Sequence, residues 1–143
     1  MENDMNPAIT IQVKVNAPAE LVWKCWTSPD DIVKWNNAYD NWHTPRAEND
    51  LKPGGKFLYL MEAKDGSFGF DFWGHYTEVI YGVKIAYTLG DGRKVSILFK
   101  TGEKLTEVVE TFELENGHPV EVQHGGWQSI LDNFKNFVEK QTK

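Results

Sequence analysis

Short turns divide residues 44–115 into a series of strand-like segments, and this rhythm restricts the chain to few folds. The turn signals are PGG at 53–55, KDGS at 64–67, GDGR at 90–93 and TGEK at 101–104. Strands joined by such short turns run antiparallel to their neighbours, so the region predicts an antiparallel meander of six strands. Within it, alternate residues share one face of each strand: Phe57, Tyr59 and Met61; Phe72, Gly74 and Tyr76; Ile85, Tyr87 and Leu89; Val95, Ile97 and Phe99.

A further strand is predicted before the meander. Residues 9–16 alternate without interruption, with Ile9, Ile11, Val13 and Val15 on one face and polar side chains on the other. This alternation is typical of a strand with one buried face. The chain therefore carries seven predicted strands.

Two short helices are predicted between the first strand and the meander. Pro18 suits the first turn of a helix that continues through Cys25 and Trp26. A second helix begins with Ser28 as its N-cap, Pro29 in the first turn, and acidic residues where the helix dipole favours them. The junction at 27–28 makes a compact angular unit.

The C-terminal segment predicts a long amphipathic helix. Trp127, Leu131, Phe134 and Val138 recur at spacings of four, three and four residues. Pro119 is a good first-turn residue and no turn signal follows it, so we place the start of the helix near residue 119.

Gly125 and Gly126 then lie inside this helix, where each glycine costs about 1 kcal/mol relative to alanine. Two alternative reasons would explain why the helix keeps both glycines despite this cost. The missing side chains open the mouth of a pocket, or they let the helix backbone pack closely against a strand or loop.

The composition restricts the classes of partner and the cellular location that we expect. A formal net charge of -6, with no basic patch, argues against nucleic acid and anionic membranes as partners. One cysteine, Cys25, excludes an intrachain disulfide and favours a small apolar filler of a helix. Without a signal peptide or an apolar span long enough to cross a bilayer, we expect a cytoplasmic protein without membrane insertion. We expect a flexible tail at 1–7 and a single domain at 8–141.

Five segments in order resemble one superfamily. They are APAELVWKCWTSPDDIVKW (17–35), DLKPGGKF (50–57), WGHYTEV (73–79), TEVVETFELEN (106–116) and GWQSILDNFKNFVE (126–139). Together they resemble the START and birch-pollen-allergen superfamily, and within it the branch related to the activator of the heat-shock chaperone ATPase.

The resemblance implies an α+β helix-grip fold. In this fold a curved seven-stranded antiparallel sheet wraps around a long C-terminal helix, and two short helices lie between strands 1 and 2. The space between sheet and helix is commonly a cavity for a hydrophobic or aromatic molecule. Lipid carriers, hormone receptors, polyketide aromatase/cyclases and chaperone activators share the fold, so the fold alone does not fix the function.

Aromatic residues make up 13% of the chain and supply candidate walls for such a cavity. Plain core packing is the alternative for each of them. The candidates are Trp35, Tyr59, Tyr76, Tyr87, Phe99, Trp127 and Leu131.

Glu110 is a further candidate ligand-binding residue. If Val108 and Phe112 face inward, Glu110 shares their face, and an inward carboxylate needs a cation, a donor or a raised pKa. The opposite strand phase would place it in solvent. An inward Glu110 would be able to orient a ligand hydroxyl.

The sequence motifs that would indicate catalysis are weak or absent. The histidines show no HExxH spacing, His124 fits a surface position, and no serine stands in a nucleophile elbow. No phosphate-binding glycine motif occurs. We therefore predict no metal, no cofactor and no catalytic residue.

The sequence leaves three functions open. The leading hypothesis is non-catalytic binding of a small hydrophobic molecule, of aromatic, polyketide or lipid type, by a monomer. The second is an interaction module that regulates a chaperone ATPase in the stress response, although the chain lacks the additional N-terminal domain of the full eukaryotic activators. The third is an aromatase/cyclase-like enzyme in which Glu110 or a tyrosine acts as acid or base.

Overall fold

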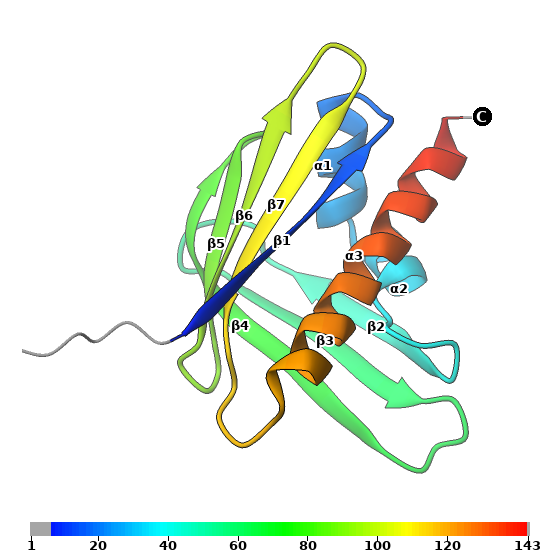
Figure 1. Cartoon of the computed structure of the whole chain (residues 1–143), viewed down its shortest axis with the longest axis vertical. Coiled ribbons are helices and arrows are strands. Elements are labelled where there is room, and N and C mark those ends of the chain that lie inside the picture. The colour runs from blue at the N-terminus through cyan, green and yellow to red at the C-terminus, as the bar shows by residue number, and fades with distance from the viewer. Residues whose placement is uncertain (1–6, 143) are drawn as a thin grey trace, which may run out of the picture.

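The structure is a computed structural model that describes residues 7–142, and in that range it contains seven strands and three helices in the predicted order (Figure 1). The expected tail at 1–7 lies outside the described residues except for Pro7. The helices are α1 (Ala19–Thr27), α2 (Pro29–Trp35) and α3 (Val120–Gln141). The strands are β1 (Ala8–Val15), β2 (Trp42–Asn49), β3 (Lys56–Ala63), β4 (Gly69–Ile80), β5 (Lys84–Leu89), β6 (Lys94–Thr101) and β7 (Thr106–Glu113).

One antiparallel sheet contains all seven strands, in the order β1-β7-β6-β5-β4-β3-β2. Every pair from β2 to β7 is a hairpin neighbour, as the short turns predicted. Gly66 and Gly92, in the KDGS and GDGR turns, have positive φ, a conformation that glycine adopts without steric cost. The sheet curls and all three helices lie on one side of it, which confirms the predicted α+β helix-grip fold (Figure 1).

The first meander strand begins earlier than the sequence indicated. β2 starts at Trp42 rather than near residue 44, because Trp42 and His43 already pair with β3. The register then shifts between His43 and Arg46. Pro45 lies at this irregularity, on an edge strand, which is where a residue without a backbone donor is tolerated.

Gly74 in β4 is required by close packing inside the sheet. A Cβ atom there would lie 2.6 Å from the carbonyl oxygen of Thr88 and 3.1 Å from the ring of Phe57. The glycine of the WGHYTEV segment therefore allows the ring of Phe57 to lie close to the backbone of β4.

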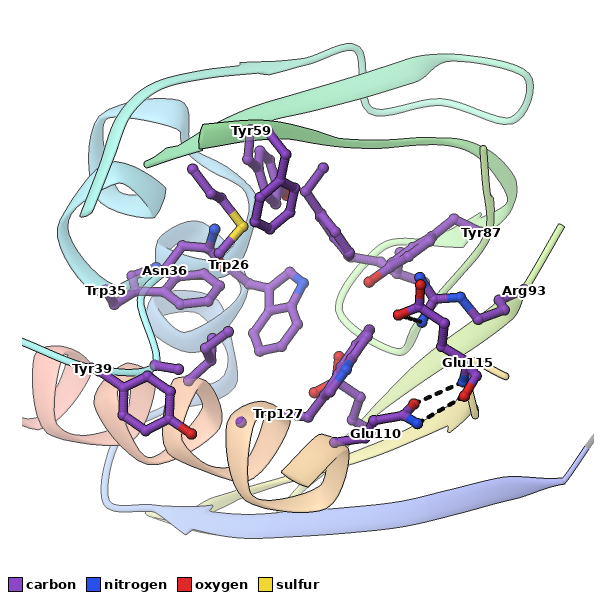
Figure 2. Close-up of a pocket in the computed structure, with 18 of the residues that line it drawn as sticks. Trp26, Trp35, Asn36, Tyr39, Tyr59, Tyr87, Arg93, Glu110, Glu115 and Trp127 are labelled. Atoms are coloured by element: carbon purple, nitrogen blue, oxygen red, sulfur yellow. Dashed lines mark hydrogen bonds and ion pairs between the residues drawn. The ribbon is translucent and has the colours of Figure 1, made fainter. Parts of the chain in front are cut away.

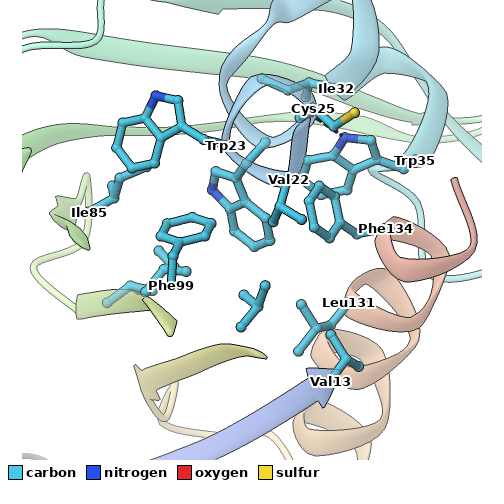
Figure 3. Packing of buried hydrophobic residues seen from close by; sticks show 14 of the residues in the cluster. Val13, Val22, Trp23, Cys25, Ile32, Trp35, Ile85, Phe99, Leu131 and Phe134 are labelled. Carbon is cyan, nitrogen blue, oxygen red and sulfur yellow. Dashed lines mark hydrogen bonds between the residues drawn. The ribbon is translucent and has the colours of Figure 1, made fainter. Parts of the chain in front are cut away.

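The C-terminal half of α3 closes one end of the sheet with a solid aromatic core (Figure 3). The fully buried Phe134 contacts the rings of Trp26 and Trp35, with ring centroids 4.8 and 4.9 Å away. Phe99 of β6 packs edge-on against Trp26 and against Trp23 of α1. Because α1 and α2 supply these rings, the volume under this half of α3 is filled.

Helix α3 runs through both glycines, as predicted, and Pro119 is its N-cap residue. A Cβ atom added at Gly125 or at Gly126 would meet no atom within 4 Å. Close packing of the helix backbone against another element is therefore not the reason for the pair. Both positions border open space.

Candidate functional site

The N-terminal half of α3 does not fill the space beneath it, and a pocket of about 330 Å³ remains there (Figure 2). Ligand pockets in proteins typically begin at about this size. The wall includes side chains of α1, α2, the segment after α2, all strands from β3 to β5, β7 and α3. The lining residues are Trp26, Trp35, Asn36, Ala38, Tyr39, Tyr59, Met61, Phe70, Phe72, Tyr76, Ile85, Tyr87, Arg93, Glu110, Glu115, Val122, Gln123, Gly126, Trp127 and Ile130.

Most of the residues predicted from the sequence lie on this wall. The structure brings together Trp35, Tyr59, Tyr76, Tyr87, Glu110 and Trp127. Their contact with a ligand stays a prediction.

Phe99 and Leu131 do not line the pocket. Phe99 is covered by Trp23 and Trp26, and Leu131, only 1% exposed, belongs to the packed core. Both side chains point inward as predicted, but they lie at the end of the sheet that α1 and α2 fill. They are therefore core residues, and we remove them from the candidate site.

Several lining residues were not among the candidates. Phe72 and Ile85 had a sequence signal, since each shares a strand face with a proposed lining tyrosine. Trp26 also had one, in the apolar spacing of α1. Arg93 and Gln123 had none, because a turn arginine and a glutamine in the first turn of a helix are ordinarily solvent-exposed.

Aromatic rings form the apolar part of the wall. Trp127 of α3 stacks on Phe112 of β7, with centroids 4.3 Å apart and planes within 6°. Its edge also meets Phe72 of β4 at 6.0 Å. Phe57 lies behind the tyrosines and contacts Tyr87 at 4.7 Å. These contacts hold the wall rings in fixed positions around the cavity.

Glu110 faces inward, which settles the strand phase that the sequence left open. Its neighbours across the sheet are Ile11 and Ile97, both buried, and its own exposure is 5%. In residues 7–142 no side chain or backbone group donates a hydrogen bond to it, and no cation pairs with it. Burial among apolar side chains raises the pKa of the Glu110 carboxyl from 4.5 to about 8. The group is therefore protonated at neutral pH.

The tyrosines give the pocket neutral polar groups. Burial raises the pKa of Tyr59, Tyr76 and Tyr87 above the ordinary value of 10.0. The Tyr76 hydroxyl donates a hydrogen bond to Asn49 Oδ1 and interacts with Tyr59. The hydroxyl of Tyr87, in contrast, has no hydrogen-bond partner within the described chain.

One edge of the pocket is polar, and its cation is paired with acidic side chains. The guanidinium of Arg93 donates to Asp91 at 2.8 Å and lies 3.9 Å from Glu115. Gln123 closes the loop before α3: its amide donates to the carbonyl oxygens of Glu115 and His118 and accepts from the Glu115 N–H at 2.7 Å. Hydrogen bonds and ion pairs within the protein therefore fix the positions of these side chains.

Within the described residues, reactive and metal-binding side chains outside the pocket do not cluster into a second site. Among the described residues, no three His, Cys, Asp or Glu side chains converge as a metal site would require. Cys25 is fully buried, and burial raises the pKa of its thiol to about 11, so the thiolate nucleophile is not formed. His124 is exposed, as predicted. Over the part of the chain described, none of the helices has the length and apolar character that crossing a bilayer demands.

A curled antiparallel sheet, a long helix across it and an aromatic pocket between them define a helix-grip protein with an internal cavity. The chain belongs to the AHSA1-like family: the family model described as "Activator of Hsp90 ATPase homolog 1-like protein" matches residues 16–139. This match confirms the branch that the five sequence segments suggested.

Solved structures agree with this assignment. The AHSA1-like protein from Aeromonas hydrophila is 41% identical, with a TM-score of 0.85 and 94% of each chain covered. A protein from Cytophaga hutchinsonii is 48% identical, with a TM-score of 0.81, covering 94% of this chain and 93% of that one. A protein from Nitrosomonas europaea, at 17% identity and a TM-score of 0.81 over 94% and 96% of the two chains, shares the fold. No match was found among proteins with curated functional descriptions.

Proposed function

We propose that this protein binds, without catalysis, a small hydrophobic molecule of aromatic, polyketide or lipid type in the pocket between the sheet and α3. The observation that carries the proposal is the unfilled volume of about 330 Å³ beneath a helix whose other half is tightly packed. An apolar molecule in this space would cover aromatic surface that is otherwise wet, which is favourable by about 25 cal/mol per Å².

The glycine at position 126 supports the same proposal. Gly126 lies on the pocket wall, and open space surrounds the position of its absent Cβ atom. Two glycines in a helix interior cost about 1 kcal/mol each relative to alanine. Access to the pocket gives a function to this cost at Gly126.

A heteronuclear NMR titration tests binding directly. With a flavonoid, an aromatic polyketide or a fatty acid as probe, we expect at least one ligand to shift the resonances of Trp127 and Tyr76. The indole of Trp23, which is buried away from the pocket, serves as an internal control. If every probe leaves both wall residues unshifted, the binding proposal is wrong.

A substitution at the mouth tests the location of binding. Gly126→Leu would project a side chain into the pocket, and we expect the affinity for the bound probe to fall roughly tenfold or more. Gly125→Leu is the matched control, since Gly125 is the adjacent helical glycine but does not line the pocket. Equal losses in the two variants would place binding elsewhere.

A second candidate function is contact with a chaperone, and the family description favours it. Exposed aromatic rings on the β3–β4 hairpin support it as well: Phe68 and Phe70 are 61% and 43% exposed and lie beside Trp42. We expect such a module to stimulate the ATPase of a heat-shock chaperone, and Phe68→Ser to reduce the stimulation. An ATPase rate that does not change on addition of the protein would exclude this candidate.

A further inference from the structure

Three side chains on the pocket wall carry hydrogen-bond donors that have no partner in residues 7–142. Their donor atoms are accessible from the cavity, since no fully enclosed side-chain nitrogen or oxygen of the described residues lacks a partner. They are the indole N–H of Trp26, the hydroxyl of Tyr87 and the carboxyl of Glu110. The side chains of Trp26 and Tyr87 point into the cavity, from opposite walls (Figure 2). Because the protein itself does not use these donors, they can bond water in the open pocket and a ligand that displaces this water.

The remaining buried polar groups of the wall are already occupied. The amide of Asn36 donates to Thr44 at 3.2 Å, and the indole of Trp35 donates to the carbonyl oxygen of Cys25 at 3.0 Å. Tyr76 is held by Asn49, and Gln123 uses both ends of its amide in the loop before α3. These groups anchor the wall and leave recognition to the three donors.

Charge restricts the ligand further. Arg93 is the one cation on the described pocket wall, and Asp91 and Glu115 both lie against it. A ligand carboxylate would therefore lose its hydration without gaining a free cation, and this loss is costly in an apolar site. Glu110, which burial keeps protonated, can donate to an oxygen that carries no charge.

We propose that the pocket selects a neutral apolar molecule that carries a hydrogen-bond-accepting oxygen, such as an aromatic ketone, and that Glu110 and Tyr87 donate to this oxygen. The inference rests on the proposed binding function and adds the chemical class of the ligand. Molecules that carry a carboxylate instead of this neutral oxygen, including fatty acids, are excluded as preferred ligands. Hydrocarbons of the same shape bind, but without the polar contact.

Three naphthalenes of matched shape test this selection: 2-acetylnaphthalene, 2-isopropenylnaphthalene and 2-naphthoate. They differ in whether the substituent is a neutral acceptor, an alkene or an anion. In a fluorescence titration near neutral pH, we expect the ketone to bind roughly five- to tenfold more tightly than the alkene, as one hydrogen bond requires. The carboxylate should bind most weakly.

A pH series assigns the donor to Glu110. The ketone does not titrate, so its affinity should fall as the pH rises through about 8 and Glu110 loses its proton. Tyr59 and Tyr87, the titratable groups that face Glu110, keep their protons in this range because burial raises their pKa values. Tyr76 does likewise, and Arg93 stays paired with Asp91 and Glu115 at the pocket edge.

Two variants separate the donor from the shape of the site. Glu110→Gln keeps an N–H donor that does not titrate, so the fall in ketone affinity with pH should disappear. Glu110→Leu keeps the volume without a donor, so the preference for ketone over alkene should shrink to about twofold or less. Circular dichroism confirms that each variant is folded before titration.

The outcomes distinguish this inference from the proposed function. Equal affinity for ketone and alkene would overturn the inference and leave apolar binding intact. Tightest binding of the naphthoate would also overturn it and make Arg93 the recognition group. An unchanged pH dependence in Glu110→Gln would remove Glu110 as the donor. If none of the three probes binds, while the NMR titration with larger ligands also fails, both proposals are wrong.

Discussion

Replacing Glu110 by glutamine is expected to raise the free energy of unfolding by on the order of 4 kcal/mol at about pH 9. The reason is the environment of the carboxyl group. It is 5% exposed, its neighbours across the sheet are Ile11 and Ile97, and its pKa is about 8 in the folded chain against 4.5 ordinarily. Glutamine has nearly the same shape and carries no charge at any pH.

The direction of the pH dependence follows from where the proton is held more tightly. The folded state binds the proton of Glu110 more strongly than the unfolded state does, so protonation favours folding. Its contribution to stability is fully present below pH 4.5 and is lost as the pH rises to about 8, where the folded state ionises as well. The gain from Glu110→Gln should therefore be near zero in acid and grow through this window.

Urea unfolding of both proteins across this pH range measures the effect. Glu107→Gln is the matched control, because Glu107 lies on the same strand with its side chain on the opposite face. We expect that substitution to change the stability by less than about 0.5 kcal/mol. A difference between wild type and Glu110→Gln that stays constant with pH would mean that the carboxyl is not desolvated in the folded protein.

The cost of a buried carboxyl bears on function. A valine or leucine at position 110 would match the apolar neighbours on both sides, yet the chain has glutamate there. Residues that break a local rule of stability are expected at functional sites. The same group that lowers stability above pH 4.5 is one of the three donors on the pocket wall that have no partner in the described residues.

The fold was predictable because its signals are local. Alternation in 9–16, short glycine turns and the spacing from Trp127 to Val138 specify strands, hairpins and a long helix without reference to tertiary contacts. The antiparallel order then follows from the turn lengths. The start of α3 near residue 119 and the passage of the helix through Gly125 and Gly126 were also predictable, because no turn signal interrupts the segment.

The site was only partly predictable because depth along a strand is a tertiary property. Tyr87 and Phe99 both face inward, but Phe99 lies beneath α1 while Tyr87 lies beneath the open half of α3. Periodicity gives the face of a residue and not its position relative to a helix from elsewhere in the chain. For Glu110, periodicity allowed two strand phases, and only its burial beside Ile11 and Ile97 decides between them.

The two halves of α3 should respond differently to the loss of an aromatic ring. Phe134 is fully buried and in contact with Trp26 and Trp35, so Phe134→Ala is expected to cost about 4 kcal/mol of unfolding free energy. Trp127 is partly exposed and borders the pocket, so Trp127→Ala should cost roughly 2 kcal/mol although it removes a larger ring.

The losses of ligand affinity in these two variants should have the reverse order. Trp127→Ala removes part of the pocket wall, including the ring that stacks on Phe112, and should weaken the binding of 2-acetylnaphthalene by roughly tenfold. Phe134→Ala removes no ring of the wall itself, although Phe134 supports Trp26 and Trp35 from behind. Its folded fraction should therefore lose less ketone affinity than Trp127→Ala does, about twofold. Denaturant unfolding and fluorescence titration of the same two variants give both quantities. If Trp127→Ala instead proves the more destabilising and leaves affinity unchanged, Trp127 is a core residue, and the space beneath the first turns of α3 is not where the ligand binds.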